Sequence, residues 1–368
     1  MTQAVVAVIR ASALQQNLAV ARHAAPDCGV MAVIKANAYG HGLLEVARIL
    51  ESADALAVAR LHEAIELRDG GVRSPLVCLS GFADTKELAL ARRYAVQSVI
   101  HTQHQIDLLA TGASNESLDV WLKVDSGMGR LGIAPDDVQT ALARLTGLGD
   151  AVRCVGLMTH LACADDLEDS KTIGQIEAFG SSLGDWRGDV SVANSAGILG
   201  WPNSTQVARR WPRAGRNWIR PGLMLYGVSP FADRSAADLG LCATMSLQAP
   251  VISVRDLAAG QTVGYGATWR ADRASRVAVV GVGYGDGLPW RAAGGEVVLN
   301  GARAPIVGRI SMDMITIDVT DVPQVRPGDT AIVWGEEVPV EDIARRVGTI
   351  PYELLTGVTG RVVRRYRD

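Results

Sequence analysis

The chain carries, at residues 29–42, the stretch GVMAVIKANAYGHG, in which an apolar run of strand length leads directly into a loop of small residues. Similar apolar runs recur along the next 190 or so residues, and segments with apolar residues at three- and four-residue spacing, typical of amphipathic helices, lie between them. The runs fall at 30–35, 54–59, 76–80, 97–101, 119–125, 154–160, 190–194 and 218–225. Eight strand–helix units in about 200 residues predict a TIM-like (β/α)8 barrel.

The pattern changes near residue 235, where helical spacing gives way to alternating runs rich in β-branched residues. These runs fall at 276–283, 296–299, 306–320 and 331–334, with one short helical segment around 340–347. We therefore expect an α/β plus all-β chain, with the barrel over residues 1–235 and a mainly β-stranded C-terminal domain over residues 236–368. A ninth apolar run, at 5–10, is not needed by the barrel, and we expect it to pair with the C-terminal domain.

The composition is that of a soluble globular protein, with 48% hydrophobic residues, 20% charged residues and a formal net charge of −3. Basic residues are scattered among acidic ones, which argues against a nucleic-acid partner. The five cysteines lie far apart without a C-x-x-C pair, so we expect neither a disulfide framework nor a metal site. No leader-like N-terminus and no apolar run near about 18 residues is visible, so we expect a cytoplasmic protein without a membrane partner.

Polar residues gather at the ends of the predicted barrel strands. In order along the chain they are Lys35, His101, Lys123, His160, the pair Asn194 and Ser195, and the segment 220–222 that begins with Arg220. Because the loops after the strands of such a barrel meet at one mouth, we expect these side chains to form a single site. The loops after strands seven and eight often hold a phosphate in such barrels, which makes Ser195, Gly222 and Leu223 candidates for anion binding.

Lys35 is the strongest candidate for covalent chemistry. Of the 36 lysine and arginine residues only four are lysines, so each position that keeps a lysine calls for an explanation. An arginine cannot form an imine with an aldehyde, whereas a primary amine at the end of an apolar strand can, because desolvation lowers its pKa. A purely structural lysine is the alternative.

The segment 32–42, AVIKANAYGHG, resembles the cofactor-attachment segment of alanine racemases, and the resemblance extends over essentially the whole chain. Further family motifs are KVDSGMGR at 123–130, VGYGAT at 263–268 and VGRISMDM at 307–314. The resemblance implies an enzyme that interconverts L-alanine and D-alanine by two-base 1,1-proton transfer, with pyridoxal 5'-phosphate attached to Lys35.

The resemblance also implies roles for individual residues. Arg220 would face the pyridine nitrogen of the cofactor, although a surface salt bridge is an alternative for this arginine. Arg130 and the backbone N–H of Met312 would bind the substrate carboxylate. Lys123 would be carbamylated, with an unmodified lysine paired to an acid as the equal alternative. The cofactor-binding set is Lys35, Tyr39, His160, Asn194, Ser195, Arg220, Gly222, Leu223 and Tyr352.

A racemase needs an acid/base on each face of the substrate. Lys35 would serve one face, and since the last of the six histidines is His160, a tyrosine is the natural candidate in the C-terminal domain. Tyr265 lies between glycines in the family's second-base motif, and it would enter the site of a partner subunit, giving a homodimer with composite active sites and a contact to His160. A tyrosine packed on a hairpin turn is the alternative.

The entrance to such a site would be lined by Tyr284, Asp313 and Tyr352, leaving room for little more than a methyl side chain. The segment 203–216, rich in arginine, is longer than the family's usual link, and we expect a solvated excursion on the mouth side of the barrel. Alternatives for the function are a broader racemase of small amino acids such as serine, a decarboxylase on the same barrel, and a non-catalytic cofactor carrier. Supply of D-alanine as a peptidoglycan precursor and alanine catabolism both remain open.

Overall fold

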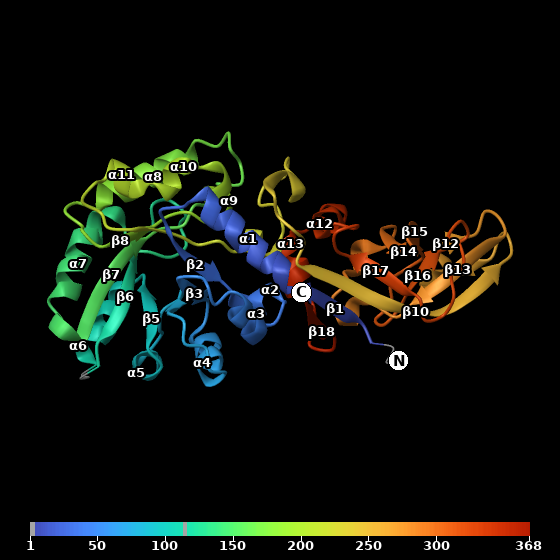
Figure 1. Cartoon of the computed structure of the whole chain (residues 1–368), viewed down its shortest axis with the longest axis horizontal. Coiled ribbons are helices and arrows are strands. Elements are labelled where there is room, and N and C mark those ends of the chain that lie inside the picture. Colours follow the sequence, from blue (N-terminus) through green and yellow to red (C-terminus); the bar gives the residue numbers. More distant parts are fainter. Residues whose placement is uncertain (1–3, 113–115) are drawn as a thin grey trace.

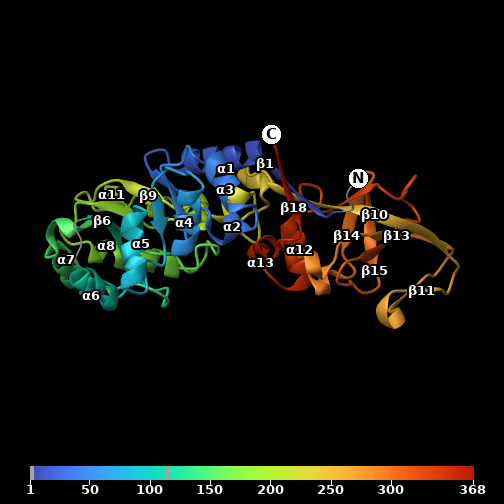
Figure 2. The same cartoon turned by 90° about the horizontal axis from the view of Figure 1, so that it is seen from below.

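A computed structural model describes residues 4–112 and 116–368 of the chain. Two bodies lie one after the other along the longest axis of the molecule, a barrel and a β-rich part (Figure 1). The view from below shows the same arrangement (Figure 2). Within the described residues no helix is long and apolar enough to cross a membrane.

The first body is a closed barrel of eight parallel strands, which confirms the predicted fold. The strands are β2 (Gly29–Val33), β3 (Ala55–Val58), β4 (Leu76–Cys78), β5 (Val96–Ile100), β6 (Leu118–Lys123), β7 (Val152–Met158), β8 (Asp189–Ser191) and β9 (Asn217–Ile219). Every residue of β2, β3 and β4 is buried. Strands covered on both faces read as continuous apolar runs, which is why the sequence located them.

Helices surround the barrel and connect its strands. They are α1 (Ala11–Ala24), α3 (Leu43–Ile49), α4 (Leu61–Asp69), α5 (Thr85–Arg93), α6 (Gln103–Thr111), α7 (Val138–Thr146), α8 (Lys171–Ser182), α9 (Ser195–Gly200), α10 (Pro202–Thr205) and α11 (Val207–Arg210). Their buried residues recur at the spacing of one helix face, for example Leu14, Leu18 and Ala21 in α1. Helix α1 therefore buries one largely apolar face.

The second body is built on an eight-stranded sheet in the order β13-β16-β15-β14-β17-β10-β1-β18, in which β13 also pairs with β10. Its strands are β1 (Val6–Arg10), β10 (Met245–Leu257), β13 (Ser275–Val280), β14 (Glu296–Leu299), β15 (Ala302–Val307), β16 (Ile315–Asp318), β17 (Thr330–Trp334) and β18 (Val363–Arg367). A hairpin of β11 (Thr262–Val263) and β12 (Trp269–Arg270) and the helices α12 (Val340–Val347) and α13 (Pro351–Thr356) complete this part.

Strand β1 belongs to this sheet and not to the barrel. It pairs antiparallel with β10, with Val6 opposite Gln248, and parallel with β18, with Val6 opposite Val363. The chain thus starts in the sheet, builds the barrel and returns to the sheet. Helix α1 continues directly from β1.

The arginine-rich segment 203–216 does not lie on the mouth side, so that expectation is wrong. Arg216 pairs with Asp54, which precedes β3, and its backbone N–H donates to Asp189 at the start of β8. Arg209 pairs with Asp27, just before β2. These acids mark the N-terminal ends of the strands, so the segment runs along the outside and reaches the face opposite the mouth.

Candidate active site

The predicted strand-end residues lie together at one end of the barrel. Lys35 follows β2, Lys123 ends β6, His160 follows β7 and Arg220 follows β9, and all four are parallel strands of the same closed barrel. Their charges act on each other: Arg220, Arg130 and Lys35 all contribute to lowering the pKa of Lys123. The structure therefore collects a strongly cationic set at the barrel mouth.

His101, which follows β5, forms hydrogen bonds with the adjacent loop and helix. Its Nε2 donates to the carbonyl oxygen of Ser80 at 3.1 Å, and its backbone N–H donates to the side chain of Gln105. These bonds fix the loop between β4 and α5 to the start of α6. Burial, and after it the charge of Lys123, lower the pKa of His101.

The amine of Lys35 is half-buried. Burial lowers its pKa, the nearby Arg130 lowers it further, and the carboxylate of Glu63 acts in the opposite direction. A lowered pKa increases the fraction of uncharged, nucleophilic amine at neutral pH. The environment of Lys35 thus suits attack on a carbonyl.

The residues after Lys35 form a left-handed turn. Ala36, Asn37, Ala38 and Tyr39 have φ angles of 55°, 54°, 51° and 51°, although none of them is glycine. This conformation costs roughly 1–2 kcal/mol per residue, so other contacts must hold it. Asn37 accepts a hydrogen bond from the backbone N–H of Leu43 at 2.8 Å, and Glu63 accepts one from that of Ala36 at 2.6 Å.

The turn places the Tyr39 side chain over the loop after β9. Its ring stacks on that of Tyr226 with centroids 4.5 Å apart and lies 6.0 Å from the ring of Tyr352 in α13. A Cβ atom on Gly222 would lie only 2.6 Å from the Tyr39 hydroxyl oxygen, so a side chain at this position would fill the space below the hydroxyl. Glycine at 222 keeps that approach open.

Ser195, in the loop after β8, contacts the same loop after β9. Its Oγ accepts hydrogen bonds from the backbone N–H groups of Gly222 at 3.0 Å and Met224 at 3.3 Å. The cap of α9 is Asn194, whose side chain accepts from the N–H of Gly197 at 2.9 Å. The hydroxyl groups of Tyr39 and Ser195 thus both lie against Gly222, and hydroxyl groups can donate hydrogen bonds to a small anion such as phosphate.

Arg220 is buried in a cage of oxygen atoms. Its guanidinium donates to Ser191 Oγ at 2.5 Å and to the carbonyl oxygens of Thr159 and Val192 at 2.5 and 3.2 Å. Its Nη2 also lies 3.4 Å from Nδ1 of His160. Among the described residues no ion pair involves Arg220, so a surface salt bridge is not its role here. Burial lowers its pKa to about 10, which leaves it charged at neutral pH.

The loop after β6 is organised by Asp125. One oxygen of this carboxylate accepts the backbone N–H groups of Gly127, Met128 and Gly129 at 3.1, 2.9 and 3.0 Å. The loop ends with Arg130, whose side chain is exposed at the mouth. Burial, followed by the charges of Arg220 and Arg130, lowers the pKa of Lys123 to about 8.

The predicted site residues of the β-rich part have exposed side chains: Tyr265 is 71% exposed, Met312 51%, Tyr284 45% and Tyr352 39%, and Asp313 is exposed as well. Tyr284 and Met312 are neighbours, since the N–H of Gly285 donates to the Met312 carbonyl at 2.8 Å. Asp313 is held by Arg361 at 2.7 Å. Tyr265 lies between β11 and β12, at the end of the molecule farthest from the barrel (Figures 1 and 2). One chain therefore does not bring Tyr265 to Lys35.

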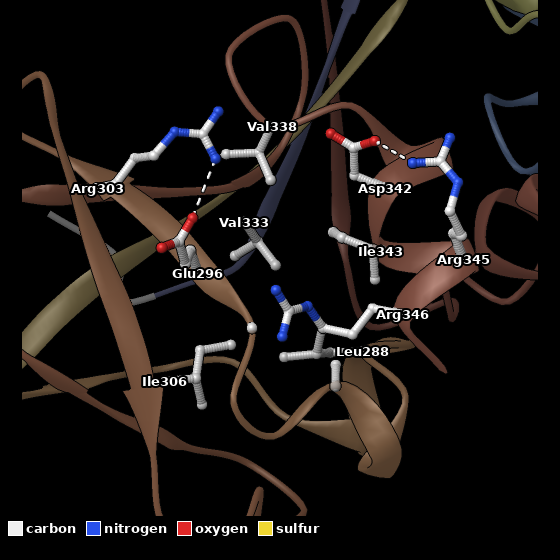
Figure 3. A pocket seen from close by; sticks show the side chains of 12 residues that line it. Leu288, Glu296, Arg303, Ile306, Val333, Val338, Asp342, Ile343, Arg345 and Arg346 are labelled. Atoms are coloured by element: carbon white, nitrogen blue, oxygen red, sulfur yellow. Dashed lines mark hydrogen bonds and ion pairs between the residues drawn. The ribbon is translucent and has the colours of Figure 1, made fainter. Parts of the chain in front are cut away.

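The β-rich part also contains a cavity of about 430 Å³, shown in Figure 3. Its charged side chains already have partners: Arg303 pairs with Glu296, Arg345 with Asp342, and Arg346 donates to the carbonyl oxygen of Gly294. None of the predicted site residues lines this cavity. The barrel mouth remains the candidate active site.

Three residues of this region were not predicted from the sequence. Glu63 contacts the turn after Lys35, and Ser191 contacts the guanidinium of Arg220. Asp125 holds the loop before Arg130. Ser191 ends β8, so its strand-end position was a usable signal. Glu63 lies inside a helix pattern, where an acid is ordinary and gives no signal.

Comparisons with known proteins identify the family of the chain. Residues 9–230 match the family model of the alanine racemase N-terminal domain, and residues 244–366 that of the C-terminal domain. The alanine racemase of Shewanella baltica strain OS185 is 47% identical over 357 residues, covering 97% of both chains. That of Vibrio cholerae is 43% identical over 365 residues, covering 99% of this chain and 98% of the other.

Solved structures show the same architecture at full length. The biosynthetic alanine racemase from Pseudomonas aeruginosa superposes with a TM-score of 0.91 at 42% identity, and the alanine racemase from Acinetobacter baumannii with 0.90 at 35%. Each of these matches covers 100% of both chains. The chain belongs to the alanine racemase family.

Proposed function

We propose that this chain is an alanine racemase that interconverts L-alanine and D-alanine with pyridoxal 5'-phosphate as its cofactor. The proposal is carried by three features at one barrel mouth. They are the half-buried amine of Lys35, the buried guanidinium of Arg220, and an anion cradle, by which we mean the hydroxyls of Tyr39 and Ser195 with the backbone of Gly222 and Leu223. Relatives that are 43–47% identical over nearly their whole length carry the name alanine racemase, which favours this reaction over a decarboxylase or a cofactor carrier.

The residues at the mouth suit the cofactor. Lys35 would attach its aldehyde, and the hydroxyls of Tyr39 and Ser195 with the backbone around Gly222 and Leu223 would hold its phosphate. Arg220 would donate to its pyridine nitrogen, and His160 and Asn194 would line the remainder of the cofactor site. When bound, pyridoxal phosphate links to the amino group of the substrate and withdraws electrons from Cα, which acidifies the Cα–H bond.

Proton transfer is then the work of two side chains. Lys35, with its lowered pKa, would remove or return the proton on one face of the substrate. Arg130 and the backbone N–H of Met312 would hold the substrate carboxylate, which fixes which face meets which base. Tyr265 would act on the opposite face, and Tyr284, Asp313 and Tyr352 would limit the entrance to a small side chain.

Tyr265 can reach a mouth only in a second copy of the chain, so we propose a homodimer with composite active sites. Two features support this: Tyr265 lies far from the barrel of its own chain, and the β-rich part exposes a set of large apolar side chains. The set comprises Tyr265, Tyr284, Trp290, Met312 and Met314. Exposed apolar groups of this kind mark association surfaces. We also propose the boundary between barrel and β domain near residue 235, and the gap between residues 230 and 244 in the two family matches supports this.

For Lys123 we propose carbamylation. A pKa of about 8 leaves a useful fraction of uncharged amine at neutral pH, and that is the form that reacts with CO₂. The nearest acid along the chain, Asp125, is engaged by three backbone N–H groups, which disfavours a simple lysine–acid pair.

The proposed reaction is tested by incubating the enzyme with L-alanine in D₂O and following both chirality and deuterium at Cα. A racemase accumulates D-alanine and deuterates both enantiomers. Release of CO₂, or no exchange at all, would reject the proposal in favour of a decarboxylase or a carrier. A comparable kcat/KM for L-serine would support the broader racemase.

A further inference from the structure

The left-handed turn after Lys35 is tied to a neighbouring helix by a single buried carboxylate. Glu63, the third residue of α4, is 7% exposed. Its Oε1 accepts the N–H of Ala36 at 2.6 Å, and its Oε2 accepts the N–H groups of Ala59 and Arg60 at 2.9 Å each. One side chain therefore joins the turn, the end of β3 and the start of α4.

This geometry requires a carboxylate, because both oxygens face donors. A glutamine would turn its NH₂ group toward at least one N–H, leaving a partly buried donor without its acceptor. Among the described residues Glu63 takes part in no ion pair, so its charge is not cancelled by a direct partner.

The same charge acts on Lys35. The charged and titratable groups around this amine are Arg130 and Lys123 from the β6 side, His160 after β7, and Glu63 from α4. Three of the four are cationic or neutral, and Glu63 is the anion that opposes them. Its carboxylate favours the protonated form of the Lys35 nitrogen.

We propose that Glu63 is a positioning residue for Lys35, which holds the left-handed turn in place and keeps a negative charge beside the lysine nitrogen. The inference rests on the proposed function, since it takes Lys35 as the cofactor-bearing residue. Fixing Ala36 fixes the backbone on which both Lys35 and Tyr39 are mounted, so one carboxylate sets the amine and the anion cradle relative to each other.

The test is a pH titration of the visible absorbance of the holoenzyme, which reports protonation of the cofactor-linked lysine nitrogen without turnover. Glu63→Gln should lower the midpoint, raising the proton dissociation constant about threefold or more, the size expected for loss of one charge near a half-buried nitrogen. Glu66→Gln, on the exposed face of the same helix, is the matched control and should titrate like the parent. A Glu63→Gln midpoint equal to that of the control would overturn the proposal.

A second variant serves if Glu63→Gln does not fold. Glu63→Asp keeps the charge but shortens the reach, so amide hydrogen exchange in the peptide 35–39 should rise at least about tenfold, the effect of losing a protecting hydrogen bond, while the titration midpoint stays near that of the parent. Unchanged exchange in this peptide would contradict the role in holding the turn. A borohydride-reducible absorbance band that persists in Lys35→Ala would reject the proposed function itself. A band that is lost in Lys35→Ala but has the same titration midpoint in Glu63→Gln as in the parent would reject only this inference.

Discussion

Asn17 offers a sharp test of how the barrel is fastened to the β-rich part. Its side chain, in α1, is 0% exposed and makes three hydrogen bonds to backbone. Nδ2 donates to the carbonyl oxygens of Leu225 at 3.0 Å and Cys242 at 2.9 Å, and Oδ1 accepts the N–H of Cys242 at 2.9 Å. Leu225 lies in the turn that follows Gly222, so the Asn17 side chain also holds the backbone next to Gly222 in place.

Asn17→Ala leaves two carbonyl oxygens and one N–H without partners. With about 1 kcal/mol per hydrogen bond and more for a buried unpaired donor, the expected loss is about 3–5 kcal/mol in the free energy of unfolding. Proteins are commonly stable by only about 5–15 kcal/mol, so the urea midpoint should fall clearly. Gln15→Ala, exposed on the same helix, is the control and should change little. Protein concentration must be held fixed because a dimer is expected.

Asn17→Asp sharpens the test through pH. A carboxylate here would face two carbonyl oxygens, so its pKa in the folded state should rise above that of the unfolded chain. The folded state then binds more protons than the unfolded state between these two pKa values, and stability should fall as the pH rises through that window. An alanine variant within about 1 kcal/mol of the parent, or an aspartate variant equal to the parent at neutral pH, would refute the reasoning.

Four further outcomes are expected. Lys35→Ala should abolish the borohydride-reducible absorbance of the bound cofactor, measured by spectroscopy after addition of pyridoxal phosphate. Tyr265→Ala should slow Cα deuterium exchange from one alanine enantiomer far more than from the other, and equal losses would contradict face-specific bases. In carbonate-free buffer, the pKa of Lys123 near 8 against 10.5 for an ordinary lysine should make stability rise between these pH values, and Lys123→Met should remove that rise. Gly222→Ala should destabilise the chain by about 1–3 kcal/mol through the contact with the tyrosine hydroxyl, measured by thermal melting, whereas Gly174→Ala, with open space around it, should not.

The barrel could be predicted because its strands are covered on both faces, which makes them visible as uninterrupted apolar runs. The last predicted strand, at 218–225, is too long, because β9 ends at Ile219. Residues 223–226 form a 3₁₀ turn whose side chains are all buried, so this apolar segment resembles a strand in the sequence. Strand β10, over Met245–Leu257, was not predicted. It contains Pro250, and proline usually argues against a central strand.

Much of the site followed from one rule, that polar residues at strand ends converge. The left-handed turn after Lys35 could not be predicted, because alanine, asparagine and tyrosine seldom adopt positive φ and nothing in their order announces it. The location of segment 203–216 was missed for a different reason. Its arginines are placed by Asp27 and Asp54, acids more than 150 residues away in the sequence, and such pairings are decided by the closed barrel.

The position of β1 between β10 and β18 has a consequence for folding during synthesis. Its two neighbours are residues 245–257 and 363–367, so during synthesis one edge of β1 stays unpaired until the first of these segments has been made, and the other edge until the second has been made. A nascent chain can close the barrel while β1 still has an unpaired edge, and such an edge can pair wrongly with a strand of another nascent chain. Synthesis of β18, rather than completion of the barrel, therefore ends the period in which β1 has an unpaired edge.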